Sequence, residues 1–154
     1  MQLPGTFSPM QDNHPEPGGM SADAVRAMQR VLREQGPAAD PLAVVRAHVA
    51  AVHCGDPQLM AADYAPGACI TRGSVVVDPW SYFPTVVQRL GASRLVVESL
   101  ELAAPDPVGA WGRVVTMRWR LDGGQAHGSC GTDTLHVQGD RIVAQHVQLH
   151  TADF

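Results

Sequence analysis

The sequence predicts a single α+β domain in which helices come first and a curved antiparallel sheet follows. Two observations support this fold class. Apolar residues recur at helical spacing in the first half of the chain after residue 21, and they alternate at strand spacing over about the last 60 residues. Helices followed by a meander of strands indicate a sheet with helices on one face. The 154 residues are enough for one domain with its own core.

We expect residues 1–20 to form a flexible leader and residues 21–154 to form the domain. The first 19 residues contain four prolines, three glycines and no apolar run. Such a composition fits neither a signal peptide nor a membrane span. Nowhere else do 18 apolar residues run together, so no contact with a membrane is predicted.

Three helices are predicted to follow this leader, and each begins at a residue that caps a helix. The capping residues are Ser21, Asp40 and Asp56, and the helices run to about Gln35, Gly55 and Tyr64. Proline follows both aspartates, as is common at the first helical position. The pair Pro66-Gly67 is expected to end the third helix.

Two short strands and a fourth helix come next. Residues 68–72 and 74–77 read as strands about a turn at Gly73, and Asp78-Pro79 begins a helix that ends at Gly91. The remainder reads as four strands, over residues 94–103, 111–121, 127–137 and 141–151. In the second of these four, one face carries Trp111, Val115, Met117, Trp119 and Leu121.

Composition excludes several functions. The chain has 11 basic and 15 acidic residues, and every basic residue is arginine. Without lysine there is no lysine Schiff base and no P-loop lysine. A mildly acidic chain without a basic stripe is also a poor candidate for binding nucleic acid.

We expect reduced thiols, a cytoplasmic location, and neither a metal nor a cofactor. The three cysteines are odd in number and widely spaced. The seven histidines do not have the spacing of metal ligands. His146 and His150, for example, are on the order of 13 Å apart along a strand, which is too far for one ion.

Three stretches together carry a resemblance to a known family. Residues 44–56 form a helix that ends in Gly-Asp, residues 59–68 contain Asp-Tyr-Ala-Pro-Gly before a strand, and residues 131–143 form a closing hairpin. In this order and spacing they resemble the NTF2-like superfamily, which contains the SnoaL-like polyketide cyclases and the ketosteroid isomerases. The resemblance implies a cone-shaped α+β barrel, in which N-terminal helices pack on a strongly curved antiparallel sheet. It also implies a deep apolar pocket and a homodimer formed through the convex face of the sheet.

Asp133 is the first candidate catalytic residue. It shares the apolar phase of its strand with Leu135 and Val137, and burial there raises the pKa of a carboxyl and favours the neutral acid. By the resemblance it aligns with a protonated aspartic acid that donates to the substrate oxyanion in ketosteroid isomerases. The alternative is a structural carboxylate that backbone N–H groups, Arg118 or Arg120 would neutralise.

His48 and Tyr64 complete the expected catalytic set. His48 lies on the inner face of its helix, three residues after Val45 and four before Val52. By the resemblance it takes the place of the oxyanion-hole tyrosine, where an imidazole can donate or act as an acid–base group; a core histidine is the alternative. Tyr64 aligns with a pocket tyrosine whose hydroxyl would link His48 or Asp133, or would only pack at the rim.

The resemblance departs at Arg72. Ketosteroid isomerases carry their proton-shuttling aspartate at this position, so a steroid isomerase is not expected. Arg72 can instead bind a carboxylate or an enolate, or be a solvated arginine at a strand end. The epoxide hydrolases of the superfamily need an Asp-Arg-Asp set, and Arg118-Trp119-Arg120 has no aspartate between its arginines.

Further residues are expected to bind the substrate. Gln145, Val147 and Leu149 share the phase of Val143 and should face the pocket, where Gln145 can orient a ligand. Met117 and Trp119 should line the apolar wall.

These residues predict a cofactor-free acid–base enzyme. It would act on a small, largely apolar molecule with a carbonyl group, through an enolate-type intermediate, in an isomerase, cyclase or aldol-type reaction. One alternative is a non-catalytic module of the same fold that binds a small molecule or dimerises. Another is a hydratase or hydrolase with His48 as the base.

Overall fold

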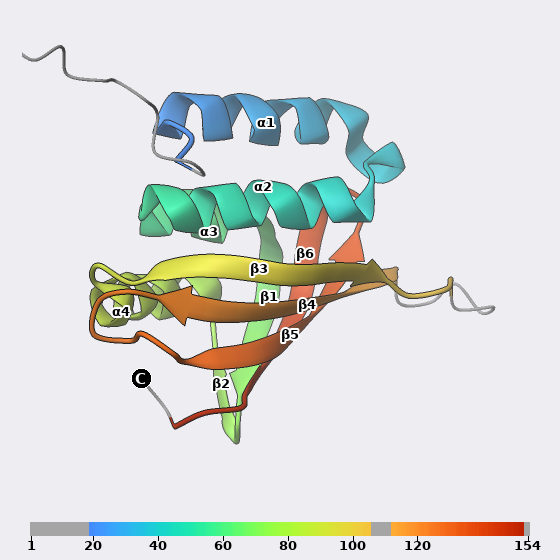
Figure 1. The fold of residues 1–154 in the computed structure, drawn as a ribbon. Helices are drawn as coiled ribbons and strands as arrows, with labels where there is room; N and C mark the ends of the chain where they lie inside the picture. The colour runs from blue at the N-terminus through green and yellow to red at the C-terminus, as the bar shows by residue number, and fades with distance from the viewer. Residues whose placement is uncertain (1–18, 106–111, 153–154) are drawn as a thin grey trace, which may run out of the picture.

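A computed structural model describes residues 19–105 and 112–152 of the chain (Figure 1). Most of the predicted leader, and the predicted strand position Trp111, lie outside the described residues. Helices cover one side of a single six-stranded sheet, with α1 stacked on α2 and α2 on the sheet. The predicted α+β class is confirmed.

The helices follow the sequence signals closely. They are α1 (Ala22–Gln35), the short 3-10 helix η1 (Gly36–Ala38), α2 (Pro41–Cys54), α3 (Pro57–Ala62) and α4 (Pro79–Leu90). Four side chains accept hydrogen bonds from backbone N–H groups at the starts of the α-helices: Ser21, Asp40, Asp56 and Asp78. Each cap satisfies a donor that has no partner within its helix. No helix of the described residues has the length and apolarity needed to cross a membrane.

The sheet is mixed, with one parallel pair. Its strands are β1 (Tyr64–Arg72), β2 (Val75–Val77), β3 (Arg94–Leu102), β4 (Arg113–Asp122), β5 (Cys130–Gln138) and β6 (Arg141–Leu149). They lie in the order β2-β1-β6-β5-β4-β3. The predicted antiparallel meander describes β3 to β6, whereas β6 pairs with β1 in parallel. The difference arises because the last strand returns to the middle of the sheet.

The third helix is shorter than the sequence predicts, and Tyr64 belongs to a strand. The helix ends at Ala62, and Pro66 and Gly67 lie inside β1. Gly67 has a φ of 79°, and the pairing of β1 with β6 shifts register between Tyr64 and Cys69. A bulge of this kind accommodates a proline and a glycine that would otherwise end the strand.

Two strand boundaries near the C-terminus also differ. The fifth strand begins at Cys130 rather than His127, because residues 123–129 form a longer connection in which His127 Nδ1 accepts from the Gly123 N–H. A register shift next to Val137 changes the phase of β6. As a result Ile142 and Gln145 are buried, whereas Val143, expected in the phase of Gln145, is only half-buried.

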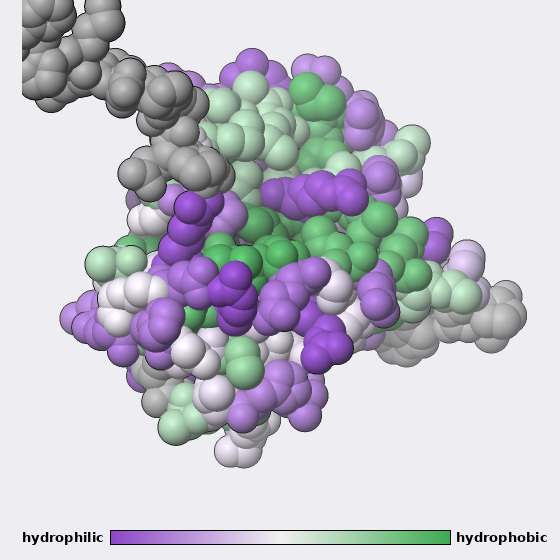
Figure 2. Space-filling model, in the orientation of Figure 1, coloured by the Kyte–Doolittle hydropathy of each residue, from purple (hydrophilic) through white to green (hydrophobic). Residues whose placement is uncertain are grey.

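The core lies between α2 and the concave face of the sheet. Its fully buried side chains come from the inner side of α2, such as Val44 and Val45, and from the strands, such as Val115, Leu135 and Ile142. Figure 2 shows apolar surface gathered in a band along the junction of α2 and β3. We call the opposite face of the sheet the convex face; it carries Thr116, Arg118, Thr134, His136 and His146.

Candidate active site

A cavity of about 70 Å³ lies between α2, α4 and the concave face of the sheet. Most of its wall is apolar. It brings together seven of the nine predicted site residues: His48, Arg72, Met117, Trp119, Asp133, Gln145 and Val147. The compartment therefore suits a small molecule or one end of a longer molecule.

Asp133 presents a buried carboxylate to this cavity. Its side chain is on β5 and the residue is 6% exposed. The Trp119 indole Nε1–H donates to Oδ1 at 2.9 Å, and the Gln145 amide Nε2–H donates to Oδ2 at 2.7 Å. Neither Arg118 nor Arg120, the partners considered from the sequence, makes a hydrogen bond to it in the described structure.

Burial raises the pKa of Asp133 to about 6, although the hydrogen bonds from Trp119 and Gln145 oppose the rise. This upward shift of the Asp133 pKa has the direction that the sequence predicts. At this pKa the carboxyl is mostly ionised at pH 7, with a fraction in the neutral form. Asp133 can therefore accept a hydrogen bond or a proton from a ligand near neutral pH.

His48 faces the same cavity from α2, and Asp63 fixes its imidazole on the side away from the cavity. The residue is 3% exposed, and its Nδ1 lies 3.3 Å from Oδ2 of Asp63. A carboxylate can only accept, so this contact places a proton on Nδ1. The ring of Phe83 packs against the imidazole with a centroid distance of 5.3 Å.

Asp63 belongs to the site although it is not predicted from the sequence. It is fully buried at the end of α3. Its Oδ1 accepts from the Gln29 amide at 3.0 Å and lies 3.9 Å from the Arg33 guanidinium, both on α1. Only its place directly before Tyr64, within the Asp-Tyr-Ala-Pro-Gly motif, could have signalled it.

Tyr64 connects the two ends of this polar network. Its hydroxyl donates to the Gln145 side-chain oxygen and lies 3.5 Å from His48 Nε2. Burial raises its pKa well above the ordinary value, so the hydroxyl stays protonated. The Tyr64 hydroxyl thus lies close to His48, but Tyr64 does not line the cavity. It positions other residues and does not meet a ligand there.

Arg72 and Tyr82 supply hydrogen-bond donors elsewhere on the cavity wall. The Arg72 Nη1–H donates to the Tyr82 hydroxyl at 3.3 Å. Burial raises the pKa of Tyr82, so its own O–H remains available as a donor. Arg72 is half-buried rather than fully solvated. Tyr82 is not among the site residues predicted from the sequence.

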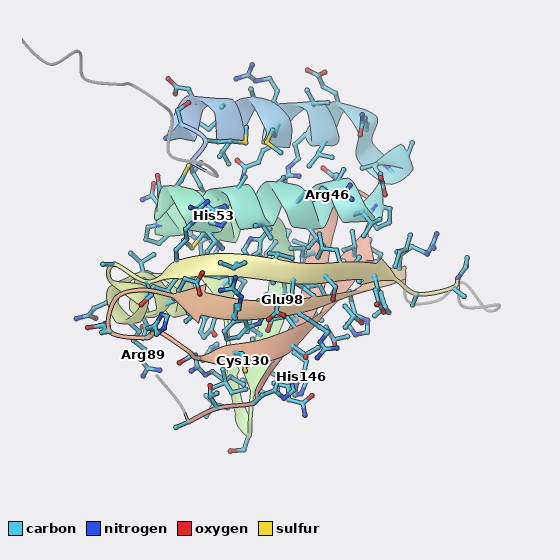
Figure 3. The ribbon with its side chains drawn as sticks, in the orientation of Figure 1. Arg46, His53, Arg89, Glu98, Cys130 and His146 are labelled. Atoms are coloured by element: carbon cyan, nitrogen blue, oxygen red, sulfur yellow. The ribbon has the colours of Figure 1, made fainter. Side chains whose placement is uncertain are left out.

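Other predicted positions lie away from the cavity. Leu149 is not among its lining residues and borders a shallower depression beside Arg72 and His146. Cys130 and His146 belong to the strand phase opposite to Asp133 and Gln145, and Figure 3 labels both on the sheet. The three cysteines are free. Within residues 19–105 and 112–152, no three histidine, cysteine or acidic side chains cluster as metal ligands would.

No protein-family model matches the sequence, and no curated protein matches it. Solved structures are nevertheless similar. An NTF2-like protein of unknown function from Cytophaga hutchinsonii has a TM-score of 0.53 at 8% identity, over 70% of this chain and 87% of that one. A protein with a cystatin-like fold from Methylobium petroleophilum has a TM-score of 0.56 at 10% identity, over 84% and 80%.

A third similar structure is that of an enzyme. The epoxide hydrolase/cyclase-like enzyme SalBIII, described in pyran ring formation in the polyether salinomycin, has a TM-score of 0.53 at 13% identity. The match covers 70% of this chain and 88% of SalBIII. At these identities the likeness concerns the fold, and it agrees with the family resemblance seen in the sequence. The chain has the NTF2-like fold, a cone-shaped α+β barrel.

Proposed function

We propose that this chain is a cofactor-free acid–base enzyme that removes a proton beside the carbonyl group of a small, largely apolar molecule. One observation carries the proposal. Asp133 is a buried carboxylate with a pKa of about 6, and it shares a largely apolar cavity with the cation Arg72. A base whose pKa lies near the working pH is effective in proton transfer.

The reaction begins with Asp133 as the base. Each carboxylate oxygen accepts one protein hydrogen bond, and a carboxylate has about four lone-pair sites, so acceptor capacity remains. The substrate C–H bond breaks and its proton forms an O–H bond on Asp133. The electron pair moves into the carbonyl group and gives an enolate, which neutral Asp133 can reprotonate at another carbon.

The developing oxyanion needs donors, and the cavity wall supplies them. Arg72 carries a positive charge and Tyr82 offers its O–H, whereas His48 already directs its Nδ1 proton to Asp63. Fixed donors in a site that excludes water stabilise the transition state strongly. If the enolate is reprotonated at another carbon, the overall reaction is an isomerisation. If the enolate attacks an electrophile in the same molecule, the overall reaction is a cyclisation or an aldol-type addition.

The remaining polar residues position these groups. Trp119 and Gln145 hold the Asp133 carboxylate, Tyr64 holds Gln145, and Asp63 holds the His48 ring. Groups locked in this way do not need to reorganise during the reaction.

A binding module of the same fold is the second candidate. Two protein donors on the Asp133 oxygens are also what a purely structural carboxylate would show. Such a module would bind a ligand in the cavity without proton transfer. The two candidates therefore differ in one measurable step.

Exchange of carbon-bound hydrogen with solvent tests the proposal. The protein is incubated in D₂O with cyclopentanone, cyclohexanone and acetophenone, and loss of the α-proton signals is followed by proton NMR. We expect faster exchange than in buffer, and a decrease of about 10² or more in Asp133→Asn, the usual scale for a general base. Asp122→Asn, which changes an exposed ion pair with Arg120, is the control.

Two results would count against the enzyme. Exchange that is equal in the wild type and in Asp133→Asn would exclude Asp133 as the base. Binding of phenols, which are neutral enol mimics, without exchange of any ketone would support the binding module.

A further inference from the structure

A second proton acceptor faces the cavity that holds Asp133, which we call the inner cavity. His48 lines it from α2, whereas Asp133 lines it from β5. Because the Nδ1 proton of His48 is directed to Asp63, the neutral imidazole carries its lone pair on Nε2. The single proton of the neighbouring Tyr64 hydroxyl goes to Gln145, so it does not occupy this lone pair.

The surroundings of His48 suit an imidazole that gains a proton. Oδ2 of Asp63 lies 3.3 Å from Nδ1, and its negative charge favours the protonated ring. This carboxylate is fully buried and is fixed by the Gln29 amide at 3.0 Å. On the other side of the ring, the Tyr64 hydroxyl oxygen lies 3.5 Å from Nε2 and can accept the added proton in a hydrogen bond. A histidine oriented by a carboxylate is the arrangement that takes protons from hydroxyl groups in nucleophilic catalysis.

A simple ketone gives up its α-proton to one base, and Asp133 is sufficient for that step. A second base in the same cavity points to a substrate that also gives up a proton from oxygen. The two bases belong to one hydrogen-bonded network, because Gln145 donates to Asp133 and accepts from Tyr64. The inner cavity measures only about 70 Å³, so the two protons lie close together on the substrate.

We propose that Asp133 and His48 act as a pair on an α-hydroxy ketone and exchange the positions of its carbonyl and hydroxyl groups. This inference rests on the proposed function of Asp133, and it names the substrate class and the form of the isomerisation. Asp133 acts on carbon, whereas His48 acts on oxygen. Asp63 is a positioning residue, which keeps the lone pair of His48 on Nε2.

The steps balance without an oxidant or a reductant. Asp133 removes the proton of the carbon that bears the hydroxyl group. The electron pair of this C–H bond forms a carbon–carbon double bond, and the carbonyl oxygen takes the negative charge. His48 Nε2 accepts the hydroxyl proton and delivers it to that oxygen. The electron pair left on the other oxygen forms the new carbonyl group, and Asp133 returns its proton to the neighbouring carbon.

Two matched ketones test the pair. 3-Hydroxypentan-2-one is converted to 2-hydroxypentan-3-one, and proton NMR distinguishes the two, whereas 3-methoxypentan-2-one has no hydroxyl proton to transfer. We expect the wild type to isomerise the hydroxy ketone faster than buffer does, and only to exchange the C3 proton of the methoxy ketone in D₂O. His48→Gln should lower the isomerisation rate by about 10², and the exchange rate of the methoxy ketone by a smaller factor.

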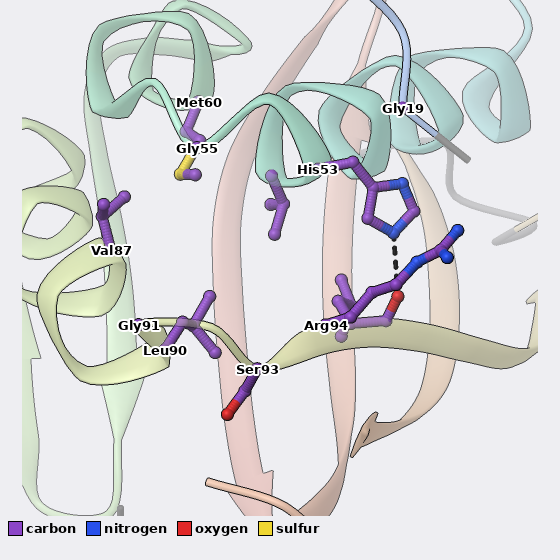
Figure 4. A pocket seen from close by; sticks show the side chains of 11 residues that line it. Gly19, His53, Gly55, Met60, Val87, Leu90, Gly91, Ser93 and Arg94 are labelled. Carbon is purple, nitrogen blue, oxygen red and sulfur yellow. Dashed lines mark hydrogen bonds between the residues drawn. The ribbon is translucent and has the colours of Figure 1, made fainter. Parts of the chain in front are cut away.

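The control is His53→Gln, at another histidine of α2. The His53 Nε2–H donates to the Leu95 carbonyl at 2.8 Å, and this residue lines a different cavity of about 240 Å³ at the C-terminal ends of α2 and α4 (Figure 4). It should retain the isomerisation. The same substitution in the same helix thus separates the role of His48 from a general effect on α2, and circular dichroism verifies that both variants fold.

Nitrogen-15 NMR of the imidazole gives a readout that does not depend on activity. At pH 7 we expect His48 of the wild type to carry its proton on Nδ1 and none on Nε2. The amide of Asp63→Asn can donate to Nδ1, which moves the proton to Nε2 and should slow isomerisation by about 10² or more. A histidine that only fills the core would show no such coupling between the position of the proton and the rate.

Three results would overturn the inference. They are isomerisation no faster than in buffer by a protein that exchanges cyclopentanone through Asp133, equal isomerisation by the wild type and His48→Gln, and a proton on Nε2 of wild-type His48. The first and the third need only the wild type and Asp133→Asn, so they decide the question even if the His48 variant does not fold. Failure of the proposed function looks different, because Asp133→Asn would then leave the exchange of cyclopentanone and of the methoxy ketone at the wild-type rate.

Discussion

The Gln145 side-chain amide donates a 2.7 Å hydrogen bond to the carboxylate of Asp133 on the neighbouring strand. The same amide accepts from Tyr64 through its oxygen, so its orientation is fixed from both ends. This bond stabilises the ionised form of Asp133 and opposes the effect of burial. The pKa of the candidate base therefore depends in part on a residue of a different strand.

Removing this donor should make Asp133 a weaker acid. In Gln145→Leu we expect the Asp133 pKa to rise from about 6 to about 7 or above, since a hydrogen bond to a charged group is worth about 1.5 kcal/mol and one pKa unit corresponds to about 1.4 kcal/mol. Carbon-13 NMR of the carboxyl group measures the change. Gln148→Leu, an exposed position on the same strand, should leave the value at about 6, and an unchanged value in Gln145→Leu would contradict the assignment.

Asp133→Asn should stabilise the protein at neutral pH. The folded pKa of about 6 exceeds the unfolded value of about 3.9, so the folded state holds the proton more tightly between about pH 4 and 6. Stability therefore falls as pH rises through this window, by up to about 3 kcal/mol. Urea unfolding at several pH values should show the variant more stable above about pH 6 and similar to the wild type below about pH 4. A gain that is independent of pH would contradict this origin.

Two tyrosine-to-phenylalanine variants should separate donors to the substrate from positioning residues. Tyr82 lines the inner cavity and Tyr64 does not. We expect Tyr82→Phe to slow α-proton exchange of bound ketones by about 10² through kcat, since it removes one oxyanion donor. Tyr64→Phe should act through Asp133 and shift the pH profile of exchange. Equal effects of both variants on kcat, without a shifted profile, would argue against this division.

Asp63 should be important for stability as well as for the site. Its removal leaves the donors of Gln29 and His48 buried without their acceptor, so Asp63→Ala should cost about 3 kcal/mol or more. Urea unfolding measures the loss. Asp23→Ala, which removes an exposed ion pair with Arg26, should change stability by less than about 1 kcal/mol.

A homodimer through the convex face remains a prediction. Light scattering at micromolar concentration should give twice the monomer mass. His146→Glu, at an exposed position of that face, should weaken the dimer because like charges meet across a two-fold axis. Arg46→Glu, on the exposed side of α2 (Figure 3), should not. A monomer in the wild type would refute the expected interface.

Local signals were sufficient for the parts of the fold that depend on neighbouring residues. Helix caps and strand phase placed His48 and Asp133 on inward faces, and both line the inner cavity. Periodicity could not show that β6 pairs in parallel with β1, because that pairing depends on residues far apart in sequence. The pair Pro66-Gly67 is typical of a helix end and therefore predicts that Tyr64 belongs to the helix before it. In the structure these two residues form a bulge within β1, and Tyr64 is the first residue of that strand.

The ionisation of Asp133 and the role of Asp63 needed the structure for a different reason. Strand phase shows that a carboxyl is buried, but its pKa depends on donors from other strands, here Trp119 and Gln145. Asp63 has no periodic signal, and its partners Gln29 and Arg33 lie on α1. Side-chain networks between distant elements are invisible to patterns within one segment.

The central position of β6 has a consequence for biosynthesis. Until residues 141–149 have left the ribosome, β1 and β5 are two unpaired edges with an empty slot between them, and exposed edges of this kind favour aggregation. The nascent chain therefore cannot complete its sheet in stages. Because Gln145 arrives with this strand, the acid–base network forms only when the sheet closes, and a ribosome-stalled chain that ends before β6 should depend on chaperones.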